Sequence, residues 1–179
     1  MEKKLIFAGF GGQGVLTLGQ IISLIQMKKG LNVSWFPSYG AEMRGGTANC
    51  SVIYSDEPIG SPVVKKNIDI LVALNEPSLR KFENAVKSGG IILIDTSTYK
   101  NAVTERKDVI VKSIDATELA SEIGNLKVLN VVVLGAFAKI TGDFTKEEAF
   151  ETLKEKLKGK EKLFEMNEKA IKIGYEKVS

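Results

Sequence analysis

Apolar residues follow two different spacings along this chain. Short, nearly continuous apolar runs such as residues 69–74 are typical of strands inside a parallel sheet. Apolar residues spaced as in Leu18, Ile21, Ile22 and Ile25 predict a helix instead. Strands are expected at residues 4–8, 32–36, 47–54, 69–74, 91–94 and 109–114. Helices are expected from Val15 to just before Gly30, over 77–87, from Asp115, over 130–140, from Thr145 and through 163–171.

Glycine, proline and capping residues mark the ends of these elements. Gly30 is a natural helix stop, Pro37 is expected to end the second strand, and Pro77 suits a first helical position. Asp115 and Thr145 each open a sequence with capping-box spacing. Strands and helices alternate without a linker or repeat. The sequence therefore predicts one α/β domain over residues 1–179, a Rossmann-like sandwich whose mostly parallel sheet has helices on both faces.

Composition narrows the class of protein. With 44% hydrophobic and 26% charged residues, the 179-residue chain reads as neither disordered nor membrane-embedded. The net charge is +3, but the lysines are dispersed among glutamates, which is typical of a solvated surface and not of a nucleic-acid footprint. The apolar stretch at residues 5–8 is too short for a signal peptide or a membrane span. We therefore expect a cytoplasmic protein that binds neither nucleic acid nor membrane.

Two features of the composition argue against chemistry on this chain. It has no histidine, the commonest general base and zinc ligand. Its single cysteine, Cys50, can form neither an internal disulfide nor an iron–sulfur site, which needs about four thiolates. Cys50 also sits in an apolar, strand-like run, which favours a buried structural thiol over a nucleophile. We expect no catalytic and no metal-ligating residues.

A glycine-rich loop follows the first predicted strand and opens the first helix. Gly9, Gly11 and Gly14 have the spacing of a dinucleotide-binding turn. Glycine lets the backbone approach a ligand closely, and free N–H groups at a helix start favour an anion. Gly11, Gly12, Gln13 and Gly14 are therefore candidate ligand contacts. The alternative is that the glycines only permit a tight strand–helix turn.

A nicotinamide cofactor makes a second demand that the sequence does not meet. It needs an acidic residue at the end of the second strand to hold the ribose hydroxyls. Residues 32–38 contain no carboxylate, and Glu42 comes only later, inside another glycine-rich loop. The first loop is therefore expected to hold a phosphate or carboxylate without NAD.

The second glycine-rich loop covers residues 38–46. It should leave the carboxyl end of the second strand, where open α/β sheets bind ligands, and lie beside the first loop. Arg44 is one of three arginines in the sequence and is followed by two glycines. Its guanidinium can present a planar fork to a carboxylate or phosphate. A surface pair with Glu42 is the alternative reading. The candidate contacts in this loop are Tyr39, Gly40, Arg44 and Gly45.

The two loops, in order, resemble those of one known family. The chain resembles the gamma subunits of 2-oxoacid:ferredoxin oxidoreductases in five segments. These are residues 9–15, 38–46, 59–62 and 75–79, and the late Asn167, Ala170 and Gly174. The same domain occurs fused within single-chain pyruvate:ferredoxin oxidoreductases. The resemblance covers nearly the whole chain. Ala41 stands where that family often has proline, a departure that affects the second loop alone.

The resemblance implies a non-catalytic role within a larger enzyme. Such enzymes convert a 2-oxoacid and coenzyme A to acyl-CoA and CO2 while reducing ferredoxin. Thiamine diphosphate, Mg2+ and iron–sulfur clusters are then expected in partner alpha, beta and delta-type subunits. The gamma-type chain is expected to bind no cofactor tightly itself, to dock these partners, and to share coenzyme A as a ligand. Gly11, Gly12, Gln13 and Gly14 would donate hydrogen bonds to the coenzyme A phosphates. Tyr39 and Arg44 would close over the ligand or bridge to the catalytic chains.

Two other readings stay open at this point. One is a purely architectural subunit whose loops dock partner chains and touch no small molecule. The other is a free-standing NAD- or flavin-dependent reductase built on the first loop. The oxoacid pocket lies outside this chain, so pyruvate, 2-oxoglutarate, a branched-chain oxoacid and indolepyruvate all remain open. A separate gamma-type chain without an attached ferredoxin domain favours 2-oxoglutarate.

Overall fold

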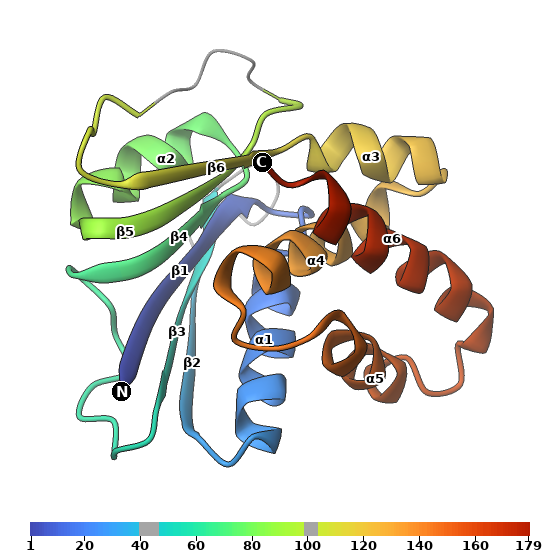
Figure 1. Ribbon diagram of the computed structural model, residues 1–179, viewed down its shortest axis with the longest axis horizontal. Helices are drawn as coiled ribbons and strands as arrows, with labels where there is room; N and C mark the ends of the chain where they lie inside the picture. The colour runs from blue at the N-terminus through green and yellow to red at the C-terminus, as the bar shows by residue number, and fades with distance from the viewer. Residues whose placement is uncertain (40–46, 99–103) are drawn as a thin grey trace.

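The computed structural model describes residues 1–39, 47–98 and 104–179. Within these ranges, six strands form one sheet in the order β2-β3-β1-β4-β5-β6 (Figure 1). The strands are β1 (Glu2–Phe10), β2 (Asn32–Tyr39), β3 (Thr47–Ser55), β4 (Ile68–Ala73), β5 (Val86–Asp95) and β6 (Ile110–Ile114). The helices are α1 (Val15–Lys28), α2 (Glu76–Phe82), α3 (Ala116–Ile123), α4 (Leu129–Thr141), α5 (Lys146–Lys156) and α6 (Phe164–Lys177). The predicted α/β class is confirmed.

The sheet has a parallel part and an antiparallel part. Strands β1, β4, β5 and β6 pair in parallel, as the near-continuous apolar runs predict. Strand β3 pairs antiparallel with both β1 and β2. Consequently β1 and β2 point the same way, and their carboxyl ends, where both glycine-rich loops start, lie at one edge of the sheet.

The ends of β2 and α2 and the cap of α3 differ from the predictions. Strand β2 continues through Pro37 to Tyr39, because β2 lies at the edge of the sheet, where proline is tolerated. Helix α2 ends at Phe82 instead of near residue 87. The Arg106 guanidinium donates to the carbonyl oxygens of Glu83, at 2.8 Å, and Val86, at 3.1 Å, beyond the helix end.

The third difference concerns the cap of α3. The helix begins after Asp115, as predicted, but the Asp115 side chain makes no cap hydrogen bond. Its carboxylate accepts instead from Thr96 Oγ1 at 2.6 Å. The Glu118 N–H donates to Ser97 Oγ at 3.1 Å, so a neighbouring loop supplies the cap. By contrast, Thr145 and Glu148 form the complete predicted capping box at the start of α5.

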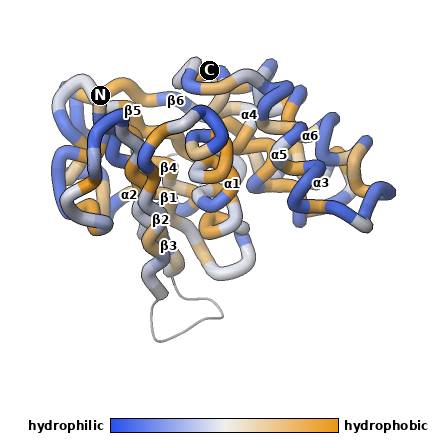
Figure 2. The backbone as a smooth tube through the Cα atoms, turned by 90° about the horizontal axis from the view of Figure 1, so that it is seen from below, coloured by the Kyte–Doolittle hydropathy of each residue, from blue (hydrophilic) through white to orange (hydrophobic). Residues whose placement is uncertain are grey.

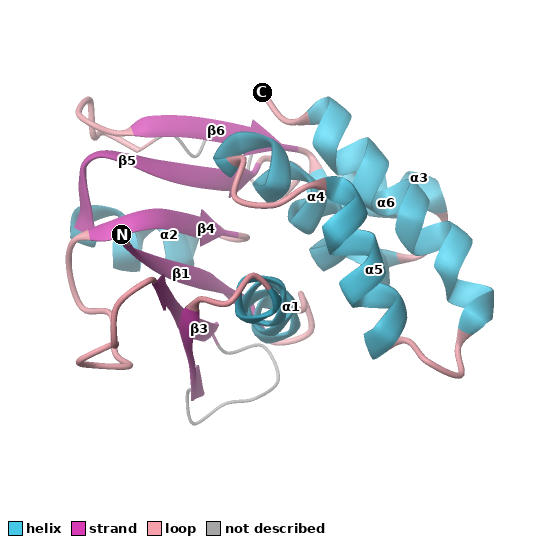
Figure 3. Ribbon diagram, turned by 60° about the horizontal axis from the view of Figure 1, so that its bottom comes forward, coloured by secondary structure: helices cyan, strands magenta, loops and turns pink. Residues whose placement is uncertain are grey.

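The two faces of the sheet are covered unequally. Figure 3 shows α1, α4, α5 and α6 gathered beside one face, with α2 on the other. Leu5 and Phe7 on the first face pack with apolar residues of α1 and α4 in the larger core. Ile6 and Ala8 on the second face pack with Leu79 of α2. Figure 2 shows the apolar positions concentrated in the sheet and the helices nearest to it. No helix in the described ranges is both long enough and apolar enough to cross a membrane.

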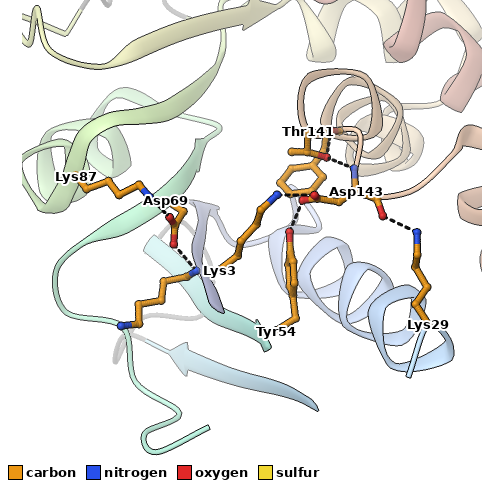
Figure 4. Close-up of polar contacts among 9 residues, drawn as sticks. Lys3, Lys29, Tyr54, Asp69, Lys87, Thr141 and Asp143 are labelled. Carbon is orange, nitrogen blue, oxygen red and sulfur yellow. Dashed lines mark hydrogen bonds and ion pairs between the residues drawn. The ribbon is translucent and has the colours of Figure 1, made fainter. Parts of the chain in front are cut away.

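A polar cluster around Asp143 joins the α4–α5 connection to the amino end of the sheet (Figure 4). The Tyr54 hydroxyl donates to the Asp143 carboxylate at 2.5 Å, and the Lys3 ammonium pairs with the same group. Lys29, just beyond α1, donates to the Asp143 carbonyl oxygen at 2.7 Å. Burial, together with the Asp143 carboxylate, raises the pKa of Tyr54, so its hydroxyl stays a donor. The cluster therefore fixes α4 and α1 relative to β1 and β3.

Helices α4 and α6 cross at unusually short range. A Cβ atom at Gly135 of α4 would overlap the carbonyl oxygen of Ile171, and one at Gly174 of α6 would overlap that of Val132. Glycine at both positions lets the two backbones touch. The late Gly174 therefore serves helix packing.

Cys50 is fully buried between the sheet and α1. Its thiol donates to the Val15 carbonyl oxygen at 3.6 Å. Burial raises the pKa of the Cys50 thiol to about 12. The geometry is that of a structural thiol, as the sequence predicts.

The α4–α6 crossing predicts that Gly174→Ala lowers the free energy of unfolding by about 3 kcal/mol, because the added methyl group has no space. Urea unfolding followed by circular dichroism measures this. Gly60→Ala is the matched control, since a Cβ there meets no atom within 4 Å, and it should change stability by less than about 0.5 kcal/mol. A Gly174→Ala protein as stable as the control would contradict the close crossing.

The burial of Cys50 predicts that the folded protein resists a thiol-specific reagent such as DTNB at about pH 8. The raised pKa keeps the folded thiol neutral at that pH, whereas an unfolded cysteine, with a pKa near 8.5, is partly ionised. One thiol per chain should react in urea, and much less than one without it. Rapid stoichiometric labelling of the folded chain would show that Cys50 is accessible.

Candidate functional site

The first glycine-rich loop joins β1 to α1 in a left-handed turn. Gly12 has φ +98° and Gly14 has φ +76°, conformations that residues with a Cβ rarely adopt. Gly14 is the N-cap of α1, and no side chain caps this helix start. The first turn of α1 also has no acidic residue. The helix start therefore presents backbone N–H groups with nothing of opposite charge on its own turn, which suits an anion.

Gln13 holds the loop in this shape. Its side-chain Oε1 accepts from the Phe10 N–H at 2.6 Å, and its Nε2 donates to the carbonyl oxygen of Leu74 at 3.0 Å. Leu74 directly follows β4, so the amide fastens the loop to the neighbouring strand. An amide has two N–H donors, and one therefore remains available to a ligand. The main role of Gln13 is therefore to stabilise the loop, and contact with a ligand is a secondary possibility for its free N–H.

The flanks of the second glycine-rich loop lie beside the first loop. Thr47, where β3 begins, pairs with Phe10 at the end of β1. Tyr39, where β2 ends, pairs with Ala48 of β3. The strand ends that flank the two loops are therefore neighbours in the sheet, as expected. Three predicted contacts of this loop, Gly40, Arg44 and Gly45, lie outside the described residues.

A groove of about 550 Å³ opens next to the first loop, between α1, α4, α5 and α6. Gly12 and Gly14 form one side of it, and Asn130 at the start of α4 forms another. The groove has an apolar wall and a basic rim. The wall is formed by Ile21, Val128, Val131, Leu153, Leu157 and Leu163, and the rim carries Lys127, Lys156 and Lys160.

Asn130 and Asn167 are the buried polar side chains of this groove. Asn130 is 8% exposed and packs against Gly14 so closely that a Gly14 Cβ would lie 2.8 Å from its Cγ. Its side-chain amide has no hydrogen-bond partner among the described residues. Asn167 of α6 is 6% exposed and donates from Nδ2 to the Leu163 carbonyl oxygen at 2.6 Å. Buried amides are normally paired, so an unpaired one facing a groove needs an explanation.

Sequence reasoning predicted the first loop but not this groove. Asn130 was visible as the polar first residue of an otherwise apolar helical run, and that was the available signal. Lys156 and Lys160 were indistinguishable from other surface lysines. The groove forms only when α5 and α6 fold back beside α1, a tertiary arrangement that periodicity does not encode.

The buried acidic residue Asp95 has structural partners. Asp95, fully buried at the end of β5, accepts from Thr117 Oγ1 at 2.6 Å and from the Ser97 N–H at 3.1 Å. Across residues 1–39, 47–98 and 104–179, no three histidine, cysteine, aspartate or glutamate residues gather where they could hold a metal ion.

Comparison with known proteins gives relatives of two lengths. Ketoisovalerate oxidoreductase subunit VorA of Methanothermobacter thermautotrophicus is 40% identical over 176 residues, covering 98% of this chain. The chain spans 36% of the length of that relative. The solved gamma subunit of a keto/oxoacid ferredoxin oxidoreductase from Geobacter sulfurreducens has a TM-score of 0.86 at 28% identity, covering 99% of this chain and 96% of that one.

A larger solved structure has the same fold in part of its chain. It is a 2-oxoglutarate:ferredoxin oxidoreductase from Magnetococcus marinus with 2-oxoglutarate, coenzyme A and succinyl-CoA bound. Its TM-score is 0.87 at 24% identity, covering 97% of this chain and 30% of that one. The family described as pyruvate ferredoxin/flavodoxin oxidoreductase matches residues 4–177. This chain therefore belongs to the pyruvate ferredoxin/flavodoxin oxidoreductase family, and its predicted resemblance to gamma subunits of 2-oxoacid:ferredoxin oxidoreductases is confirmed.

Proposed function

We propose that the chain, as one gamma-type domain over residues 1–179, is the non-catalytic gamma subunit of a cytoplasmic thiamine-dependent 2-oxoacid:ferredoxin oxidoreductase. The complex would convert a 2-oxoacid, coenzyme A and oxidised ferredoxin to acyl-CoA, CO2 and reduced ferredoxin. The observation that supports this role is the start of α1 beside the carboxyl end of β1, which has no side-chain cap and no acidic residue in its first turn. The sole cysteine of the chain is buried, and the sequence has no histidine.

The electron and carbon chemistry would belong to partner chains. Thiamine diphosphate and Mg2+ would lie in the alpha and beta subunits, and iron–sulfur clusters in beta and delta-type parts. One buried thiol cannot hold such a cluster. Ferredoxin would then reach the complex through these partners. The isolated chain is accordingly expected to be inactive and to bind no cofactor tightly.

Coenzyme A is the ligand that we assign to the two-loop edge. Gly11, Gly12, Gln13 and Gly14 would donate hydrogen bonds to its phosphates from the start of α1. Arg44, with Tyr39, Gly40 and Gly45 around it, would close over the same phosphates from the second loop. An arginine fork matches phosphate geometry, and a helix N-terminus favours the negative charge. The Magnetococcus marinus enzyme, which shares this fold, was solved with coenzyme A bound.

A purely architectural subunit is the principal alternative, and it makes different predictions. It requires that loop variants fail to assemble, whereas the coenzyme A role requires that they assemble with impaired kinetics. A free-standing NAD- or flavin-dependent reductase is the weaker alternative. Strand β2 ends at Ser38 and Tyr39 without the carboxylate that a nicotinamide ribose needs.

Two substrate classes deserve separate assays. The 35% identity with the 2-oxoglutarate synthase subunit KorC of Methanocaldococcus jannaschii, covering 98% of this chain and 94% of that one, supports 2-oxoglutarate. The 40% identity with the ketoisovalerate subunit supports a branched-chain 2-oxoacid as the second candidate. Reconstituted complex should be assayed with 2-oxoglutarate, ketoisovalerate and pyruvate, and the highest kcat/KM identifies the class.

The coenzyme A role predicts that Arg44→Ala in the assembled complex raises the KM for coenzyme A about tenfold, because a charge-assisted contact to phosphate contributes about 1.5–3 kcal/mol. The assay follows 2-oxoacid-dependent reduction of a dye acceptor at varied coenzyme A. Arg80→Ala is the matched control, since Arg80 pairs with Glu76 and Glu83 on its own side of α2. Its KM should stay within twofold of wild type, about the scatter of the assay.

Gel filtration of the same variants separates the alternatives. Arg44→Ala that assembles fully and has a raised KM supports the coenzyme A role. Arg44→Ala that no longer assembles supports the architectural role. An assembled variant with wild-type KM and kcat would refute the assignment of Arg44.

A further inference from the structure

We propose that the groove between α1, α4, α5 and α6 binds a phosphorylated nucleoside, with phosphate at its lysine rim and the nucleoside along its apolar wall. This inference deepens the proposed function, because the nucleotide end of coenzyme A is one source of such a ligand. A free nucleotide is the other source. Gly12 and Gly14 of the first loop form one side of the groove, whereas its lysines and its apolar wall come from other elements.

Two helix starts converge on this groove without a counter-charge. Helix α4 is 13 residues long, and its first turn, like that of α1, has no acidic residue. It continues the 3-10 turn Leu126–Val128, where the Asn125 side chain accepts from the Lys127 N–H. By contrast, α5 has the Thr145 cap followed by Glu147 and Glu148. The starts of α1 and α4 meet where Gly14 contacts Asn130. Their dipoles therefore add in the same small volume and favour an anion there.

The buried amide of Asn130 is an independent indication of a ligand. Asn130 is 92% buried, and a polar side chain buried to this extent normally has a hydrogen-bond partner. Asn130 lines the groove and has no such partner within the described ranges. Asn167, across the groove on α6, uses its Nδ2 internally, and its Oδ1 accepts nothing from the described residues. Together the two amides offer both donors and acceptors, the pattern that recognises the edge of a base.

The positive charge of the groove favours an anionic ligand. Its lining includes Lys127, Lys156 and Lys160 and no acidic residue. The Lys127 and Lys160 ammonium groups have no ion-pair partner in the part of the chain that the structure describes, and Lys156 contacts the neutral Gln20. The size of about 550 Å³ falls within the range of small-molecule sites. An apolar wall with amides and a cationic rim suits a nucleoside phosphate better than a simple anion or an apolar molecule.

The direct test is calorimetric titration of the full chain at low ionic strength with adenosine 3′,5′-bisphosphate. We expect saturable binding of the bisphosphate. Inorganic phosphate alone and adenosine alone should each bind with a Kd at least tenfold higher. The double variant Lys156→Ala/Lys160→Ala should weaken binding at least tenfold. The matched control is Lys158→Ala/Lys162→Ala, which removes the same charge from the same segment but from lysines outside the groove lining. It should weaken binding less than threefold.

A second variant keeps the proposal testable if the lysine pair affects folding. Asn130→Ala should weaken bisphosphate binding while circular dichroism shows an unchanged fold. Absence of saturable binding to the wild-type chain would overturn the proposal. So would equal weakening by the two lysine pairs, which would indicate general electrostatics, or equal affinity for inorganic phosphate and the bisphosphate.

The same variants in the assembled complex separate this inference from the proposed function. A raised KM for coenzyme A in Lys156→Ala/Lys160→Ala, with a smaller increase for dephospho-coenzyme A, identifies coenzyme A as the source. Weakened bisphosphate binding with an unchanged KM identifies a free nucleotide and leaves the groove assigned. The opposite result is also possible: the isolated chain binds no nucleotide, and Arg44→Ala still raises the KM for coenzyme A in the complex. That result would refute the groove as a nucleotide site and would leave the coenzyme A role of the loops in place.

Discussion

The backbones of α4 and α6 touch at Gly135 and Gly174, and this contact positions the whole helical side of the molecule. Because the crossing leaves no space for a side chain, α6 is held against the sheet-covering α4, and α5 follows beside α1. The Asp143 cluster fixes the other end of α4 to β1 and β3 (Figure 4). Asn130 is consequently held against Gly14, and the groove takes its shape between two rigid helix starts.

The function that we propose would depend on backbone groups more than on reactive side chains. The start of α1 presents uncapped N–H groups, and Gln13 keeps it in place. Such groups bind negative charge and do not transfer protons or electrons. A subunit built this way suits holding a phosphorylated substrate for partner chains. The buried, un-ionised Cys50 thiol is consistent with that role.

Periodicity and turn chemistry predicted the elements well, because most helices and strands here bury a regular apolar face. The first loop was predictable because its glycine spacing reports backbone geometry directly. The exceptions have tertiary causes. Pro37 is tolerated because β2 proved to be an edge strand. Helix α2 passes into the 3-10 turn Glu83–Ala85, where the Glu83 carbonyl oxygen accepts from Arg106, far along the chain. The groove was missed because its lysines and Asn130 come together only through the α4–α6 crossing.

The central claim is that this chain contributes ligand-binding surface to a larger enzyme. Hydrogen–deuterium exchange of the assembled complex, with and without coenzyme A, tests it most directly. The account predicts ligand-dependent protection in peptides covering residues 9–21 and 125–131, which contain the starts of α1 and α4. Protection confined to the partner chains, with these peptides unchanged, would contradict it.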